Sequence, residues 1–338
     1  MAALPVTNPT LLDLANRMDP NGKIPDIVEL LHQQNEILDD MVWKEGNLPT
    51  GHKTKTRTGL PTPTWRRLNQ GVMATRSETA DITETCGFME AYSKIDKKEM
   101  DLNGNTAAFR LSEDAAHLEG MNQSLATTLF YGDETVDPQK FTGFAPRMTD
   151  NTAEYGENMI DGGGGTGADN ASIWLVGWGD NTIFGIIPKG MPAGFQHTDK
   201  GMMTVPTHDA SGAYTGDMEA YVSHYSWDTG LCVKDWRYLV RIPNVDKTAL
   251  TKNAASGADI LDLMTIACET IHSLSNVRPV FYVPRTIRSW MRRQIVSKVA
   301  SSTLTMGEVA GKPVTMFDNI PVRRCDALAG DEADITFS

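Results

Sequence analysis

The chain has 338 residues, of which 40% are hydrophobic and 22% charged, so it has the composition of an ordinary globular protein and room for two domains. Its formal net charge of −12 argues against a protein that binds nucleic acid over its whole surface. No apolar run reaches the roughly 18 residues of a membrane span, and the N-terminus lacks the features of a secretory signal, so no membrane contact is expected.

The charges are unevenly distributed along the chain. Residues 1–43 hold two basic and seven acidic side chains, whereas residues 44–71 hold six basic side chains and only one acid. Residues 278–298 carry six basic side chains and no acid. Separate segments of the chain are therefore suited to contacts with oppositely charged partners.

The N-terminal region is predicted to form two short amphipathic helices, over residues 10–18 and 24–43, separated by a turn at residues 19–22. Two helices with so little apolar surface cannot make a core of their own. We therefore expect residues 1–43 to pack as an arm on another part of the chain or on another chain. The apolar residues expected to make this contact are Leu11, Leu12, Ile27, Leu31 and Leu38.

Residues 50–70 alternate threonine with charged residues or proline around residues 59–61, which predicts a two-stranded hairpin inside an extended loop, residues 44–75. It has almost no face to bury, and an isolated two-stranded ribbon is marginal in water. We expect it to lie on an acidic partner; a disordered basic loop is the alternative. The residues expected to make the contact are Lys53, Lys55, Arg57, Leu60, Trp65, Arg66 and Arg67.

A long helix is the most regular feature of the chain and follows a strand expected at residues 82–95. Ser112 is a candidate N-cap, Gly132 is placed to end the helix, and the element is assigned to residues 106–131. Twenty helical residues span roughly 30 Å. Apolar residues spaced at three and four positions form one predicted buried stripe: Leu111, Ala115, Leu118, Met121, Leu125 and Leu129.

The C-terminal half mixes strands and helices, which gives a mixed α+β class. Residues 172–190 are predicted to form a β-hairpin, and residues 217–243 hold a further strand and an aromatic-rich segment. A helix is expected at 257–275, a buried strand at 280–283 and a basic helix at 285–299. Strand pieces around Asp318-Asn319 are expected within residues 313–325.

No pattern of catalytic or metal-ligating residues stands out, so neither an enzyme nor a cofactor is predicted. The seven histidines form no zinc motif, and the four cysteines lie far apart, which favours free thiols. The glycine-rich residues 161–167 lack the Lys-Ser/Thr of a phosphate loop. His224 with Ser223 and Asp228 suggests a hydrolase triad only weakly, because no GxSxG motif accompanies them.

The basic segment near the C-terminus is open to two interpretations. It could contact phosphate, or it could pair with acidic segments of neighbouring copies of the chain, which we favour. The side chains concerned are Arg285, Arg288, Arg292, Arg293 and Lys298.

An amphipathic arm, a basic hairpin without a core, a strand and a long helix resemble the opening of a tailed-bacteriophage major capsid protein of the Hong Kong 97-like fold. In that family these parts are the N-terminal arm, the extended loop and the peripheral domain with its spine helix. The closest resemblance is to coat proteins of a short-tailed (podovirus) phage group and extends over about residues 10–328. The segments that look like that group's recurring blocks are 106–121, 172–190, 221–242, 280–290 and 312–328.

The order of the later segments departs from most members of this fold. The pieces comparable to the axial-domain helix and strand stand at the C-terminal end, so the two halves look exchanged. The resemblance then implies an arm at 1–43, an extended loop at 44–75, and two discontinuous domains. The peripheral domain is assigned to 76–134 and 191–250, and the axial domain to 135–190 and 251–338.

The resemblance implies a structural protein that self-assembles into an icosahedral shell of hexamers and pentamers around double-stranded DNA, without sequence-specific binding. It implies a place in the virion, assembly in the host bacterial cytoplasm, and procapsid maturation. The implied partners are a scaffolding protein and a portal protein, with a cement or decoration protein as a further candidate. Some members cross-link a hairpin lysine, for which Lys53 and Lys55 are candidates. The alternatives are an encapsulin-like shell with a cargo protein and a soluble hydrolase that uses His224.

Overall fold

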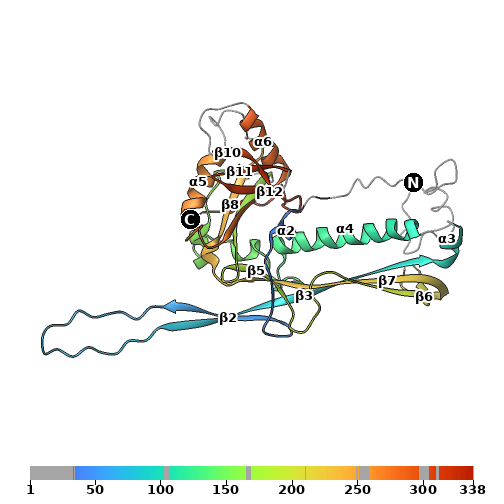
Figure 1. Cartoon of the computed structure of the whole chain (residues 1–338), viewed down its shortest axis with the longest axis horizontal. Helices are drawn as coiled ribbons and strands as arrows, with labels where there is room; N and C mark the ends of the chain where they lie inside the picture. Colours follow the sequence, from blue (N-terminus) through green and yellow to red (C-terminus); the bar gives the residue numbers. More distant parts are fainter. Residues whose placement is uncertain are drawn as a thin grey trace. The chain divides into compact units, whose positions relative to one another are not determined.

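The structure is a computed structural model, and its chain trace is shown in Figure 1. It describes residues 33, 35–102, 107–164, 169–209, 211–248, 250, 259–296, 304–309 and 312–337. The described residues fall into two compact units. Unit 1 contains residues 88–124 and 194–227, and unit 2 contains residues 33–87, 125–193 and 228–338.

The core of unit 2 is a sheet built around β4 (Asn170–Trp178), in which every residue is buried. β4 pairs antiparallel with β8 (Leu239–Asp246) and with β9 (Arg278–Val283). A continuous apolar strand of this kind needs cover on both faces. The sheet continues from β9 through β12 (Ile320–Arg324) and β11 (Lys312–Phe317) to β10 (Leu304–Val309). Its helices are α5 (Ile260–Thr270) and α6 (Arg285–Val296).

The turn between β11 and β12 follows directly from its sequence. Asp318 and Asn319 both have positive φ, 47° and 64°, which matches the pair of left-handed residues in a type I′ hairpin turn. Asp and Asn tolerate this conformation better than most residues. The strand pieces predicted around these two residues are present.

The β-hairpin predicted at residues 172–190 is wrong. β4 and β5 (Ile183–Ile187) are paired at one position only, Trp178 with Ile183, and in parallel. β5 instead pairs with β1 (Trp43–Glu45) and with β7 (Tyr214–Val233). Both apolar strands are buried along their whole length, so each takes its backbone partners from remote parts of the chain.

Close packing between β1 and β5 requires a glycine. A Cβ atom at Gly185 would lie 2.7 Å from the ring of Trp43, its register partner on β1. Residues 43–45, which the sequence placed at the junction of arm and loop, are therefore part of the unit 2 sheet.

The extended loop contains a ribbon, but its second strand is not the one predicted. β2 (Gly51–Gly59) pairs antiparallel with β3 (Glu78–Asp96), with Lys53 opposite Thr83. Residues 60–77, named here the loop tip, form neither helix nor strand. The physical reason is that the prolines at 61 and 63 have no N–H to donate to a strand ladder, so β2 ends before them at Gly59. The partner strand, β3, begins only at Glu78, after the loop tip.

Unit 1 is built from the C-terminal half of β3, α3 (Lys97–Leu102), the first part of α4 (Ala107–Tyr131), β6 (Gln196–His208) and the N-terminal part of β7. β6 and β7 form a long antiparallel pair. Its apolar clusters are small. Among its described residues, one cluster joins Ile95 and Met100 with Tyr221, and a second is centred on Val205, Ala220 and Val222.

The long helix α4 ends at Tyr131, as predicted. A Cβ atom at Gly132 would lie 2.6 Å from the carbonyl oxygen of Thr128, so the residue after the helix has no room for a side chain. The end of the helix carries Phe130 into an aromatic cluster, where its ring centre lies 5.8 Å from Phe144 and 6.0 Å from Trp174. Tyr282 of β9 completes this cluster at 6.3 Å from Phe130.

Short elements complete the described chain. They are α2 (Ile37–Asp40) and three 3₁₀ turns, η1 (Ala145–Arg147), η2 (Glu154–Asn158) and η3 (Trp236–Tyr238). The helix predicted at 24–43 is wrong over most of its described part: only Ile37–Asp40 is helical, and the chain enters β1 at Trp43. Residues 24–32 and 34 lie outside the described residues. None of the described helices combines the length and the hydropathy of a membrane span.

Replacing Phe130 by alanine is expected to lower the free energy of unfolding by roughly 3–5 kcal/mol, because it removes a fully buried ring and leaves a cavity. Leu118→Ala on the same helix is the matched control: Leu118 is 39% exposed, so its truncation is expected to cost less than about 1 kcal/mol. Urea unfolding of the unassembled subunit measures both. Equal losses for the two variants would contradict this account of where the helix is buried.

Candidate assembly interface

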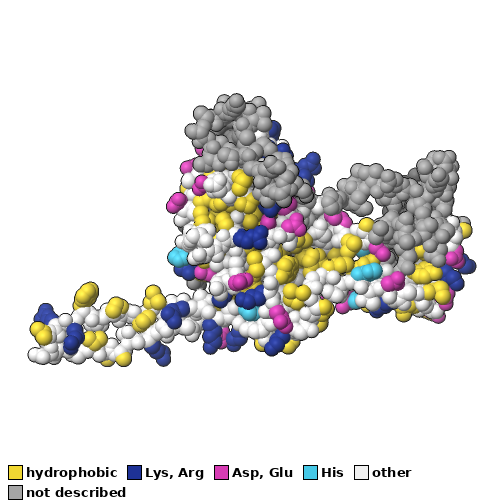
Figure 2. All heavy atoms as spheres, viewed as in Figure 1, with side chains coloured by type: hydrophobic (Ala, Val, Ile, Leu, Met, Phe, Trp, Pro, Cys, Tyr) yellow, Lys and Arg dark blue, Asp and Glu magenta, His cyan; other side chains and the backbone are white. Residues whose placement is uncertain are grey.

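The loop tip leaves apolar side chains in water. Trp65 is 100% exposed, Leu68 95% and Met73 89%. The tip contains no aspartate or glutamate, and Figure 2 shows its far part in blue and yellow without magenta. Exposed apolar groups that are gathered in one segment mark an interaction surface rather than ordinary surface.

The five cations predicted to contact a partner divide into two groups. Lys53 and Lys55 both lie near Asp81 of the same ribbon, at 2.9 and 3.8 Å. Arg57, Arg66 and Arg67 have no carboxylate within ion-pair distance among the described residues, and Arg66 donates instead to the Gln70 carbonyl oxygen at 3.3 Å. Of the five predicted cations, the three arginines are therefore the ones whose charge is not already paired with a carboxylate in the described part of the chain.

A buried ion pair fixes the root of the ribbon. Arg147 donates to both carboxylate oxygens of Glu84 on β3, at 2.7 and 2.6 Å, and also to the backbone carbonyls of Gly143 and Thr142. The side chains of Arg147 and Glu84 are only 11% and 7% exposed. Removing one member of such a pair leaves the other charge buried without a partner, which destabilises the fold. No sequence signal identified these residues, because an isolated glutamate and an arginine 63 positions apart carry no motif.

The last turn of the predicted arm is fixed to unit 2 by charge. Glu36 accepts from Arg288 of α6 at 3.0 Å and from Arg323 of β12 at 3.3 Å. Asp40 accepts from Arg323 at 3.1 Å and from the Tyr282 hydroxyl at 3.2 Å. The chain is thus anchored at residues 36–40 before it enters β1.

The predicted arm residues have different positions relative to this anchor. Leu38 is half-buried within it, beside the fully buried Ile37. The other four predicted contacts lie outside the described residues: Leu11, Leu12, Ile27 and Leu31.

The basic helix α6 is partly used within its own chain. Arg288 pairs with Glu36, so its expected pairing with a neighbouring copy is replaced by a contact inside the subunit. Arg285, Arg292 and Arg293 are exposed. Lys298 lies outside the described residues.

The buried face of the long helix α4 differs from the predicted stripe over its described first half. Met121, Leu125 and Leu129 are buried as predicted, but Ala115 and Leu118 are exposed, and the side chain of Leu111 lies outside the described set. In unit 1, the helix instead turns His117 toward the sheet, where its ring stacks on Tyr225 at 6.1 Å. The prediction was based on hydrophobicity alone, so it did not identify His117, a polar aromatic residue, as part of the packed face of the helix.

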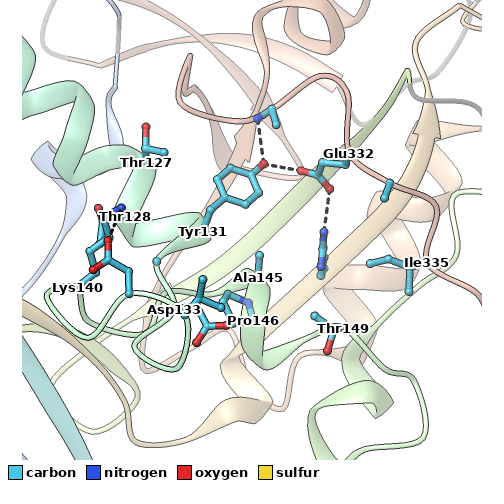
Figure 3. A pocket seen from close by; sticks show the side chains of 16 residues that line it. Thr127, Thr128, Tyr131, Asp133, Lys140, Ala145, Pro146, Thr149, Glu332 and Ile335 are labelled. Carbon is cyan, nitrogen blue, oxygen red and sulfur yellow. Dashed lines mark hydrogen bonds and ion pairs between the residues drawn. The ribbon is translucent and has the colours of Figure 1, made fainter.

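The C-terminal segment closes onto the end of α4 through a second buried network. Arg241 of β8 donates to Glu332 at 2.8 Å and to the Met148 carbonyl oxygen at 2.7 Å. Glu332 also accepts from the Tyr131 hydroxyl at 2.5 Å and from Ser172. These contacts, part of which Figure 3 shows, hold residues 329–335 against the helix end.

A pocket of about 740 Å³ lies beside this network, within unit 2 (Figure 3). Tyr131 and Ala145 belong to its inner wall, and Val136, Ala333 and Ile335 contribute apolar groups nearer the surface. Besides Glu332, which Arg241 pairs with, the lining holds two more acids, Asp133 and Asp137, and Lys140 pairs with Asp137 at 3.1 Å. No pattern in the sequence indicated this pocket, because its walls come from three separate segments of the chain.

The geometry contradicts a Ser223–His224 dyad. The two residues are consecutive on β7, so their side chains project from opposite faces of the sheet. Ser223 is buried, whereas His224 lies 3.2 Å from Glu90 and stacks on Tyr92. The hydrolase alternative therefore loses its nucleophile.

Comparison with known proteins gives a family over nearly the whole chain. Residues 19–336 match the family described as major capsid protein GP7. The solved structure of bacteriophage Epsilon15, obtained from cryo-EM and modelling, is 34% identical, with 100% of both chains covered and a TM-score of 0.72. Comparison with curated proteins finds no match.

Two more distant structures illustrate the limits of the likeness. The capsid of bacteriophage JBD30 is 10% identical, with 88% of this chain and 92% of that chain covered and a TM-score of 0.45. The holo-SrpI encapsulin complex from Synechococcus elongatus PCC 7942 is also 10% identical, with 70% and 96% covered and a TM-score of 0.39. At such scores neither likeness carries an argument about this chain.

The Asp40 anchor should make stability depend on pH. Burial raises the pKa of Asp40 above its ordinary value of 3.8, and the nearby Arg323 only partly opposes this. The folded chain therefore holds this proton more tightly than the unfolded chain, so the stability that Asp40 contributes is complete below pH 3.8 and is lost as pH rises through the folded-state pKa.

Asp40→Asn cannot titrate, so the free energy of unfolding of the natural chain should fall relative to that of the variant as pH rises through this window. Urea unfolding of the unassembled subunit at a series of pH values measures the difference. A difference that is constant with pH, or that changes in the opposite direction, would contradict the assignment. Asp39→Asn is the matched control, because Asp39 is exposed in the same turn.

Proposed function

The chain belongs to the major capsid protein GP7 family, and from this premise we propose how its copies join into an icosahedral shell. Its role as a phage major capsid subunit and its Hong Kong 97-like α+β fold, both predicted from the sequence, are confirmed by the family match and the full-length likeness at 34% identity. The subunit is therefore a component of the virion capsid. The encapsulin-like alternative is supported by no likeness that carries an argument.

We propose that the extended loop of each subunit lies on a neighbouring copy. The observation that carries this proposal is the exposure of Trp65, Leu68 and Met73 in a segment that has no core of its own. Burying apolar surface contributes about 25 cal/mol per Å², so covering the loop tip stabilises the assembled state. The uncompensated Arg57, Arg66 and Arg67 favour an acidic neighbouring surface.

The N-terminal arm is proposed to contact a neighbour through Leu11, Leu12, Ile27 and Leu31. The anchor at Glu36 and Asp40 supports a division of the arm into a fixed root and a longer segment before it. In this proposal Leu38 stabilises the root rather than the contact with the neighbour. The domain assignment from the sequence remains a proposal: the arm at 1–43, the loop at 44–75, the peripheral domain at 76–134 and 191–250, and the axial domain at 135–190 and 251–338. The two compact units divide the chain differently, since β8 pairs with β4 in unit 2.

The shell is proposed to consist of hexamers and pentamers and to enclose double-stranded DNA without sequence-specific contacts. The net charge of −12 supports this, because an acidic subunit does not hold the DNA that it encloses. Assembly in the host bacterial cytoplasm with a scaffolding protein and a portal protein follows from the same reading, and a cement protein is a further candidate. The exchanged order of the later segments stays a prediction.

Replacing the loop tip, residues 60–77, by a two-residue Asn-Gly turn should abolish stable shells while the subunit remains folded. The β2–β3 ribbon and its root at Glu84 lie outside the replaced segment, and the tip contributes nothing to the core. Electron microscopy and gradient sedimentation of the expressed particles measure assembly, and circular dichroism measures folding. Shells of normal stability from this variant would refute the proposal.

The arginines of the loop should matter more for assembly than the lysines. Arg57→Gln/Arg66→Gln/Arg67→Gln is expected to weaken assembly and to reduce its sensitivity to salt, because these charges have no internal carboxylate among the described residues. Lys53→Gln/Lys55→Gln is the comparison and should have a smaller effect, since Asp81 already pairs with both lysines. Light-scattering titrations at several salt concentrations measure the order, and the reverse order would count against an acidic partner.

A further inference from the structure

The pocket beside the end of α4 is an open apolar site within one unit of the subunit. Its volume of about 740 Å³ falls in the range of roughly 300–1,000 Å³ that is typical of pockets for organic groups. Val136, which lines this pocket, is 82% exposed to water. Covering its side chain would therefore be favourable. The inner wall is rigid, because Tyr131 is hydrogen-bonded to both Glu332 and the Ala329 amide.

The loop tip carries a side chain of matching size and chemistry. The indole of Trp65 is completely exposed and Leu68 follows it three positions later, also exposed. Tryptophan is among the residues that most often anchor protein interfaces, since its large ring fills a pocket while its N–H can reach a polar group. The subunit itself places no wall around this indole.

The charges around the two features are complementary. Arg66 and Arg67 follow Trp65 directly, and the tip contains no acid. The pocket lining holds three acids and two cations, of which Glu332 and Arg241 pair with each other. Of the other two acids, Asp133 accepts hydrogen bonds from Thr135, which lower its pKa further below neutral pH. Lys140 offsets Asp137 only, which leaves Asp133 available to a guanidinium group.

We propose that the pocket receives the loop tip of a second copy of this chain, with Trp65 as the inserted anchor and Arg66 beside Asp133. This inference rests on the proposed function and gives the loop a defined receptor on the neighbouring subunit. Trp65 is fully exposed in its own subunit, so it does not occupy the pocket of that subunit. In a shell built from copies of one chain, the Trp65 that enters the pocket therefore belongs to a second copy. Repeated around a ring, the contact is heterologous and closes with the symmetry of the capsomer.

A disulfide between the two sites tests the proposal in assembled particles of the full chain. Trp65→Cys combined with Ala333→Cys should yield covalent multimers on non-reducing denaturing gels, because a disulfide requires the two Cβ atoms to approach within roughly 4.5 Å. Since Trp65→Cys also removes the indole, the particles are assembled above the higher subunit concentration expected for Trp65→Ala. Ala333 is exposed at the pocket, so the substitution leaves the fold intact. Trp65→Cys with Ala153→Cys is the matched control, with an exposed alanine of the same unit that does not line the pocket, and it should yield monomers.

Filling the pocket tests the same contact without the loop. Ala333→Trp should raise the subunit concentration needed for half-maximal assembly at least roughly tenfold, as expected when a buried aromatic anchor is displaced. Ala153→Trp should leave it unchanged. Trp65→Ala should reproduce the effect of Ala333→Trp, and the double variant should be no worse than either single variant.

The outcomes separate this inference from the proposed function. Particles that form normally with Trp65→Ala and Ala333→Trp, and that give no multimers with the cysteine pair, would overturn the inference while the subunit remains a shell protein. Multimers from Leu12→Cys with Ala333→Cys, but not from Trp65→Cys, would assign the pocket to the N-terminal arm and also overturn it. Failure of the natural chain to form any shell would instead count against the proposed function.

Discussion

The structure depends on the burial of the end of the long helix α4 against the unit 2 sheet. Phe130 is fully buried among Phe144, Trp174 and Tyr282, and the helix ends at the next residue, Tyr131, before Gly132, where a side chain has no room. Segments remote in the chain are fixed relative to this point. The C-terminal residues reach it through Glu332, and the strand of the extended loop reaches the adjoining segment through Arg147.

This arrangement explains how a coreless ribbon can be presented by a stable subunit. An isolated two-stranded ribbon is marginal, but the buried Glu84–Arg147 pair fixes its root at one end. The loop tip beyond it gains nothing from its own fold, because its prolines prevent pairing and its apolar groups remain in water. A subunit of this design leaves the apolar groups of its loop tip uncovered, which suits a capsid protein that assembles from many copies.

Several elements could be predicted because their cause is local. The end of α4, the Asp318-Asn319 turn and the solvent-exposed basic loop all follow from residues within a few positions of each other. The predicted pairing of residues 172–190 failed, because two fully buried strands choose partners by burial rather than by proximity in the sequence. The prediction that Leu118 is buried also failed. The first half of the helix packs on a thin sheet through His117 and not on a deep apolar core.

By itself, the sequence determined the class of protein. It also showed that the arm and the basic loop, which precede a long helix, contain too few apolar residues to form a core of their own. Only the tertiary structure decided which charges remain for a partner. Lys53, Lys55 and Arg288 are engaged within the subunit, whereas Arg57 and Arg66 have no acid nearby in the described chain. It also decided where a pocket forms, because the walls of the pocket beside Tyr131 come from segments that approach only when the sheet and the helix end pack together. The reason is that local propensity depends on neighbouring residues, while ion pairs and cavities depend on distances that folding alone sets.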